Sequence, residues 1–229
     1  MEPTGRDDRD AELGRQAVRL YRRYEVEVVQ AFGLCPWAER ARQEGRVHER
    51  VVPSPAPEPP AVAKVVRELA DDARVHIGLM LFPRFDVDRI GFERFVGEVR
   101  RCIDSRRDAS PGPRPDAALA AFHPDAEADL ASAERLVPFV RRTPDPTIQL
   151  VRQSVLDRLR ESRPHGTGLV DLDTVDLDAF MAQPDPGPPL HERVAEHNLE
   201  TVEREGVARL ETVFEAIRAD RQHAYADLI

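Results

Sequence analysis

The stretch from Val75 to Phe82, VHIGLMLF, is apolar along most of its length and is followed at once by Pro83. A run of this kind is typical of a strand whose two faces are both covered, and the proline ends it. We therefore predict an α/β protein in which helices pack on a sheet that contains this strand.

Two further segments predict strands, one before this run and one after it. Arg46 to Val52 alternates and is rich in β-forming residues, and Ala117 to Phe122 is a short apolar segment. Apolar residues at helical spacing separate the strands, at Val62 to Ala73 and at Asp88 to Ser105. Because strands that alternate with helices favour right-handed crossovers, we expect a small, mostly parallel three-stranded sheet flanked by helices.

The remainder of the chain is predicted to be helical. Residues 11 to 44 form one long helix, or two that separate near Gly33, with the second running from Pro36 to about Gln43. The second half is predicted to hold helices at Ala131–Arg141, Pro146–Glu161 and Leu172–Met181, and two more within Leu190–Ile229 that meet near Gly206. We expect one α/β domain over residues 11–221, preceded by a disordered tail of residues 1–10.

Composition excludes several classes of protein. The chain has 229 residues, of which 41% are hydrophobic, and a formal net charge of −9, which argues against binding to nucleic acid or to an anionic membrane. Cys35 and Cys102 are too few for a disulfide framework, and neither a signal sequence nor a membrane-spanning apolar run is present. We therefore expect a cytoplasmic protein.

The first candidate for chemistry is Cys35, within Gly33-Leu34-Cys35-Pro36-Trp37. If Pro36 opens a helix, Cys35 is its N-cap, where the helix dipole stabilises negative charge and lowers the pKa of a thiol. Cys35 is then a nucleophile, a redox thiol or a metal ligand. The alternative is a small buried residue at a helix start.

The second candidate is His123, which follows the third predicted strand and precedes Pro124. Ligands of open α/β sheets lie beyond the carboxyl ends of parallel strands, and a polar residue at this point faces that crevice. His123 is thus predicted to be a general acid or base, or a ligand. The alternative is a loop histidine that caps the segment after it.

The third candidate is the basic turn from Arg141 to Pro146, RRTPDP. Thr143 or Asp145 can cap a helix that starts at Pro146. Arg142 and Arg152 are suited to bind a carboxylate or a phosphate beside the free backbone N–H groups. The alternative is a solvated basic turn.

Taken together, these motifs resemble a bacterial family of uncharacterised proteins, domain-of-unknown-function family 1415. The resemblance rests on GLCPWA from Gly33, the strand that ends in Phe82-Pro83, FHPD from Phe122, RTPDP from Arg142 and HNLETV from His197, in that order. It implies no activity, but its motifs pick out Cys35, His123, Arg142 and Arg152. Gln149 stands where the family has histidine, so the resemblance assigns that position no metal or acid–base role.

The leading hypothesis is an enzyme that acts on a small anionic molecule. Cys35 or His123 would perform the chemistry, and Arg142, Thr143 and Arg152 would hold the anion. One alternative is a metal- or haem-binding protein with Cys35 and His123 as ligands, and another is a non-catalytic interaction module that uses the acidic, helical second half. No HExxH, CxxC, GxGxxG or Walker motif occurs, so the sequence assigns no cofactor.

Overall fold

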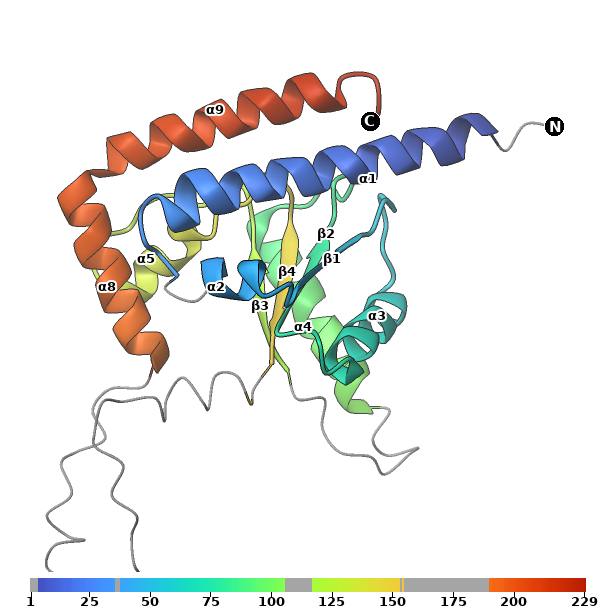
Figure 1. The fold of residues 1–229 in the computed structure, drawn as a ribbon, viewed down its shortest axis with the longest axis horizontal. Helices are drawn as coiled ribbons and strands as arrows, with labels where there is room; N and C mark the ends of the chain where they lie inside the picture. Colours follow the sequence, from blue (N-terminus) through green and yellow to red (C-terminus); the bar gives the residue numbers. More distant parts are fainter. Residues whose placement is uncertain (1–3, 36–37, 106–116, 153, 155–189) are drawn as a thin grey trace, which may run out of the picture.

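A four-stranded sheet with helices on both faces forms the centre of the molecule (Figure 1). The computed structural model describes residues 4–35, 38–105, 117–152, 154 and 190–229. The strand order is β1-β2-β4-β3. The strands are β1 (Val47–Val51), β2 (Ile77–Leu81), β3 (Ala118–Phe122) and β4 (Thr147–Val151).

The direction of the strands corrects the predicted sheet. The mixed α/β class is confirmed, and β1 and β2 are parallel as expected. However, β4 pairs antiparallel with both β2 and β3, so the sheet has four strands and is mostly antiparallel. The prediction of a mostly parallel three-stranded sheet is therefore wrong.

The error lies in β4, which we predicted to be the start of a helix from Pro146 to Glu161. The pair Ile148 and Val151 fits helical spacing, but the stretch also alternates with a period of two. Ile148 and Leu150 are fully buried in one apolar cluster, while Gln149 between them points to the other face of the sheet. Because β4 pairs with two strands, tertiary hydrogen bonding decides in favour of the extended conformation.

Apart from Pro146–Glu161, the helices in the described part of the chain follow the predicted ranges closely. They are α1 (Thr4–Tyr24), the π-helical segment η1 (Glu25–Gln30), α2 (Ala38–Gln43), α3 (Pro59–Asp71), α4 (Arg89–Ser105), α5 (Ala133–Val140), α8 (Leu190–Glu205) and α9 (Val207–Tyr225). Helix α1 begins at Thr4 and so extends into the segment expected to be a disordered tail. Arg84 secures that end through an ion pair with Asp10 at 2.5 Å. The helix predicted at Leu172–Met181 lies outside the described residues.

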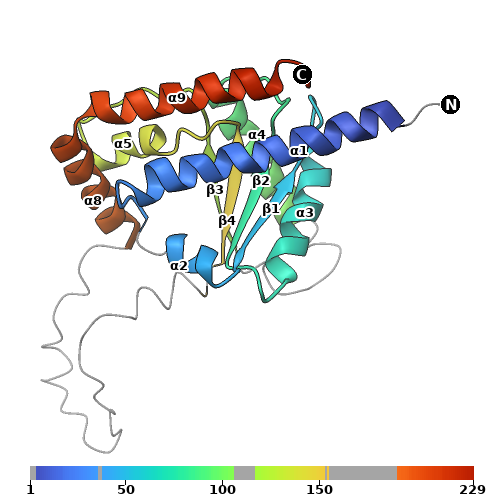
Figure 2. The same cartoon turned by 45° about the horizontal axis from the view of Figure 1, so that its top comes forward.

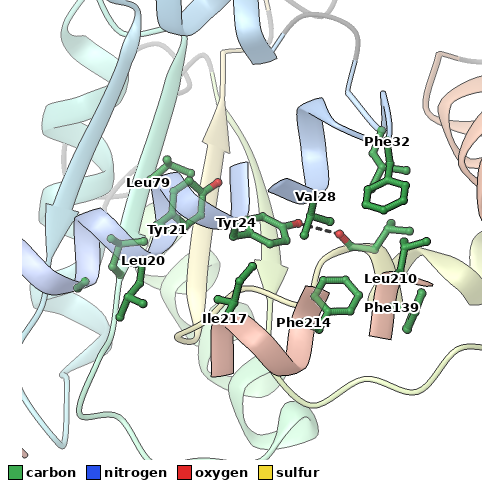
Figure 3. Close-up of a cluster of buried hydrophobic side chains, with 14 of the residues drawn as sticks. Leu20, Tyr21, Tyr24, Val28, Phe32, Leu79, Phe139, Leu210, Phe214 and Ile217 are labelled. Atoms are coloured by element: carbon green, nitrogen blue, oxygen red, sulfur yellow. Dashed lines mark hydrogen bonds between the residues drawn. The ribbon is translucent and has the colours of Figure 1, made fainter. Parts of the chain in front are cut away.

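Each face of the sheet carries its own apolar core. Helices α3 and α4 cover one face, and Met80 of β2 belongs to the apolar cluster beneath them. On the other face α1 crosses the sheet with α9 beside it (Figure 2), and α5 and α8 complete the layer. Figure 3 shows Tyr24 of α1 between Leu79 of β2 and Phe214 of α9. This second layer encloses the candidate site.

Segment η1 continues α1 with wider turns. Ala31 N–H donates to the carbonyl oxygen of Val26 at 3.1 Å and Leu34 N–H to that of Val29 at 2.9 Å, so both bonds span five residues. Gly33 follows with a φ of 63°, a conformation that glycine adopts without strain and that ends the helix as predicted. Single π-helical turns often occur at functional sites. Here the segment delivers the chain to Cys35.

Cys35 and Cys102 both carry thiols and not a disulfide. Among the described helices, none combines the length and the apolar character that crossing a membrane requires.

Candidate functional site

A cavity of about 670 Å³ lies between the sheet, η1, α5 and α8, and continues round the edge strand β3 to α4. Its size falls within the range of small-molecule sites. Cys35 and His123 both line it, so the structure brings these two predicted site residues to one cavity. Arg142, Thr143 and Arg152 are not among the described residues that line it.

The cation in the wall of the cavity on the side of α5 is Arg141, one position before the predicted Arg142. Its guanidinium carbon lies 5.1 Å from the centre of the Phe122 ring. Burial lowers the pKa of Arg141, and Tyr24 and Cys35 partly offset that effect. No carboxylate among the described residues contributes to its pKa, so within that part of the chain the partly buried guanidinium has no carboxylate counter-ion.

The acidic groups on this side are already balanced. Glu25 also lines the cavity, but its carboxylate accepts a short hydrogen bond from Arg42. Arg42 also pairs with Glu49, to which Arg22 donates at 3.1 Å. Two arginines therefore neutralise two glutamates, and the positive charge of Arg141 remains uncompensated by them.

The backbone at Arg141 is held on two sides. The Tyr24 hydroxyl donates to the carbonyl oxygen of Val140 at 2.7 Å, the bond drawn in Figure 3. The carbonyl oxygen of Arg141 accepts from the N–H groups of His123 at 3.2 Å and Thr143 at 3.0 Å. The guanidinium therefore starts from a fixed point, which is a requirement for a preorganised binding site.

Cys35 is half-buried at the end of the loop that leaves η1. Its carbonyl oxygen accepts from the N–H of Ala38, the first residue of α2, at 3.4 Å, and His197 of α8 approaches the Gly33 carbonyl oxygen at 3.2 Å. Pro36 and Trp37 lie outside the described residues, so the N-cap geometry of Cys35 stays a prediction.

His123 is 4% exposed, and both its ring nitrogens have partners. Nε2 lies 2.8 Å from the carbonyl oxygen of Val87, and Nδ1 accepts from the N–H of Asp125 at 3.1 Å. A carbonyl oxygen only accepts and an amide N–H only donates, so the ring is the neutral tautomer protonated at Nε2. In this arrangement neither nitrogen is open to a substrate proton or a metal ion.

Arg142 and Thr143 anchor the turn and do not reach the cavity. Nη1 of Arg142 donates to both carboxylate oxygens of Glu211 in α9 at 2.7 Å, and its Nε donates to Pro124 O at 3.2 Å. The hydroxyl of Thr143 is buried and donates to the carbonyl oxygen of Asp145 at 2.7 Å. These contacts give both side chains a structural role in place of the predicted anion contact.

Arg152 binds backbone carbonyl groups at the C-terminal end of α3. Its guanidinium donates to the carbonyl oxygens of Ala70, Asp72 and Val75 at 2.7–3.0 Å. The last carbonyls of a helix lack intrahelical partners, and a cation there is favourable. Helix α3 packs on the opposite face of the sheet from α1 and α5, so this arginine is not brought together with Cys35.

Arg141, Gln149 and Asn198 are among the polar residues that line the cavity, and the sequence analysis chose none of them as a site residue. Asn198 is 7% exposed, and its Oδ1 has no hydrogen-bond partner among the described residues. For each of the three residues, the sequence contains a feature that could have identified it. Arg141 opens the basic turn, Asn198 lies in HNLETV, and Gln149 is the polar member of an alternating strand.

The described part of the chain contains no group of three or more His, Cys, Asp or Glu side chains suited to hold a metal ion. The metal- or haem-binding alternative therefore stays a prediction, without a ligand set in these residues.

Comparison with known proteins gives a family but no activity. No curated protein and no solved structure matches the chain. The family described as proteins of unknown function, DUF1415, matches residues 17–170, a range that includes Cys35, His123 and Arg141. With two thirds of its length matched in this way, the chain belongs to the DUF1415 family.

Proposed function

We propose that the protein is an enzyme that binds a small anionic molecule in the cavity between the sheet, η1, α5 and α8. Arg141 is the counter-charge for the anion, and the thiol of Cys35 is the reacting group. This proposal keeps the substrate class and the nucleophile expected from the sequence. It replaces Arg142, Thr143 and Arg152 by Arg141 as the anion-binding residue.

The observation that carries the proposal is the partly buried, uncompensated guanidinium of Arg141. An unpaired charge away from water costs several kcal/mol, and chains keep such a group where a ligand supplies the opposite charge. The aromatic face of Phe122 stabilises the cation in part. An anion in the cavity would complete the pairing.

Cys35 gives the same cavity a nucleophile. The guanidinium of Arg141 interacts favourably with Cys35 once the thiol has lost its proton, and the thiolate is the reactive form. In the proposed step, the sulfur forms a bond to an electrophilic carbon of the bound anion, and that carbon releases an electron pair to its leaving group or carbonyl oxygen. His123 has no part in this step, since both its nitrogens bond to the backbone.

Alkylation of Cys35 tests the proposal directly. In a Cys102→Ser background, iodoacetate and iodoacetamide both form an S–C bond and release iodide, but only iodoacetate is an anion. We expect the rate ratio of iodoacetate to iodoacetamide to be at least about tenfold higher in the folded protein than in the urea-unfolded protein. Arg141→Gln should abolish this gain.

The matched control is Arg94→Gln, which removes an exposed arginine of α4 that does not line the cavity. It should leave the ratio unchanged. An equal ratio in folded and unfolded protein, or a ratio that survives Arg141→Gln, would overturn the proposal.

A further inference from the structure

The wall of the cavity is largely apolar. Leu34, Ile77 and Leu79 border it from the loop and the sheet, and Val140 and Val194 from α5 and α8. Pockets of this kind bury the body of a ligand by the hydrophobic effect and use a few polar groups to orient it. The body of the ligand is therefore expected to be apolar, with its charge at one end.

The charge balance of the wall favours an anion of charge −1. Among the described residues of the wall, Arg141 is the partly buried cation without a carboxylate partner, since Arg89 is paired with Glu93 at 2.5 Å. Arg100 is exposed to solvent, which screens its charge, and it donates to the carbonyl oxygen of Leu119. A phosphate monoester carries close to two negative charges at neutral pH, whereas a carboxylate carries one and matches the planar guanidinium with two parallel hydrogen bonds. One guanidinium therefore fits a carboxylate better than a phosphate.

A second, independent group points into the same cavity. Asn198 of α8 lines it, is 7% exposed, and has an Oδ1 without a hydrogen-bond partner among the described residues. A buried acceptor that stays unpaired destabilises the fold, so a ligand that brings a donor to Oδ1 would gain affinity there. Hydroxyl and N–H groups are such donors.

We propose that the ligand is an apolar monocarboxylic acid that also carries a hydroxyl or N–H donor. Its carboxylate pairs with Arg141, its body lies against the apolar wall, and its donor meets Oδ1 of Asn198. This inference rests on the proposed anion site, and it adds the class of anion and a second recognition point.

Calorimetric titration of the full chain with three sets of probes tests it. The probes are straight-chain alkanoates of about six to twelve carbons, their ω-hydroxy derivatives, and alkyl phosphates of the same lengths, which a pocket of this class encloses. The series scans the separation between the carboxylate and the hydroxyl. We expect alkanoates to bind at least about tenfold more tightly than alkyl phosphates, with affinity that rises with chain length.

The hydroxyl should add at least about threefold in affinity at one chain length, because it pairs with Asn198. Asn198→Leu should remove that gain and leave the binding of plain alkanoates intact. Arg141→Gln should weaken every alkanoate by at least about tenfold, and the Arg94→Gln control should not.

The outcomes separate this inference from the proposed function. Alkyl phosphates that bind more tightly than alkanoates and depend on Arg141 would overturn the carboxylate class while the anion site stands. Hexanoate that binds as tightly as decanoate would overturn the apolar body. A hydroxyl that gives no gain at any length, or a gain that survives Asn198→Leu, would overturn the second contact. Failure of the proposed function itself shows in the iodoacetate ratio.

Discussion

The backbone N–H of His123 donates a hydrogen bond to the carbonyl oxygen of Arg141 at 3.2 Å. His123 directly follows β3 and Arg141 directly follows α5, so this bond ties two loops that border the cavity. The imidazole ring of His123 holds the same loops in position through its hydrogen bonds with the carbonyl oxygen of Val87 and the N–H of Asp125. We infer that His123 positions Arg141 and takes no direct part in chemistry.

Replacing His123 should therefore affect stability more than reactivity. His123→Gln is expected to lower the free energy of unfolding by about 2 kcal/mol, because the carbonyl of Val87 and the N–H of Asp125 lose a well-placed partner. The backbone bond to Arg141 persists in this variant. The iodoacetate preference of Cys35 should stay within about twofold of that of the parent protein. A preference lost in a variant that remains folded would assign the ring a role in the site.

The hydroxyl of Tyr24 is expected to matter for both stability and binding. Tyr24→Phe removes the bond to the carbonyl oxygen of Val140, next to Arg141, and leaves a buried acceptor unpaired. We expect a loss of about 1–2 kcal/mol in urea denaturation and weaker alkanoate binding.

Tyr21→Phe is the matched control for Tyr24→Phe. Tyr21 lines the same cavity, and its hydroxyl has no hydrogen bond to a described residue. Equal losses of affinity in the two variants would mean that the bond to Val140 does not position the guanidinium.

Arg142 is expected to contribute stability and no binding. Arg142→Met leaves Glu211 without its partner and should cost about 3 kcal/mol, whereas Glu211→Gln should cost less because this side chain is 37% exposed. The double variant should be more stable than the sum of the two losses predicts, by about 1–2 kcal/mol. All three variants should keep the iodoacetate preference, and its loss in Arg142→Met alone would restore Arg142 as an anion contact.

The ion pairs of Asp220 join α9 to α1, and we expect acid to weaken this contact. Hydrogen bonds from Arg19, at 2.8 Å, and from Arg23, at 2.9 Å, lower the pKa of Asp220 to about 2. Because the folded pKa lies below the unfolded value near 4, the stabilisation is complete above about pH 4 and is lost as the pH falls towards 2.

The measurement is urea denaturation of the parent protein and of Asp220→Asn at pH 7 and at pH 2. Since the pair is partly exposed, we expect a difference of about 1 kcal/mol at pH 7 that falls to a small fraction of this value at pH 2. Comparing the two proteins removes the effect of other groups that titrate in the same range. A difference that does not change with pH would locate the effect of the substitution outside the ion pair.

Local patterns explain which parts of the fold the sequence predicts. The run VHIGLMLF identifies β2 because both faces of that strand are buried, and all five residues of the strand are therefore buried. The pattern of Thr147 to Val151 does not distinguish a strand from a helix, because apolar residues at Ile148 and Val151 also fit helical spacing. Pairing with β2 and β3, which are distant in sequence, decides between them.

The site is predictable to the level of a segment and not of a side chain. The sequence predicts an anion contact at the basic turn. Its two neighbouring arginines point to different places: Arg141 lines the cavity, and Arg142 pairs with Glu211. The direction of each depends on how α5 ends, with Arg141 at its C-cap. That geometry, like the approach of α8 to the cavity, is set by packing between elements far apart in the chain.

The π-helical segment η1 makes the response of the site to a deletion depend on where the residue is lost. A π-helical turn holds one residue more than an α-helical turn, so removing one residue from Glu25–Gln30 would let the segment close as an ordinary α-helix with the following chain in nearly the same direction. Removing one residue from α1 would instead turn the chain that follows by about 100° relative to the residues before the deletion. A single-codon deletion in α1 would thus keep the thiol and Arg141 chemically intact and still separate them.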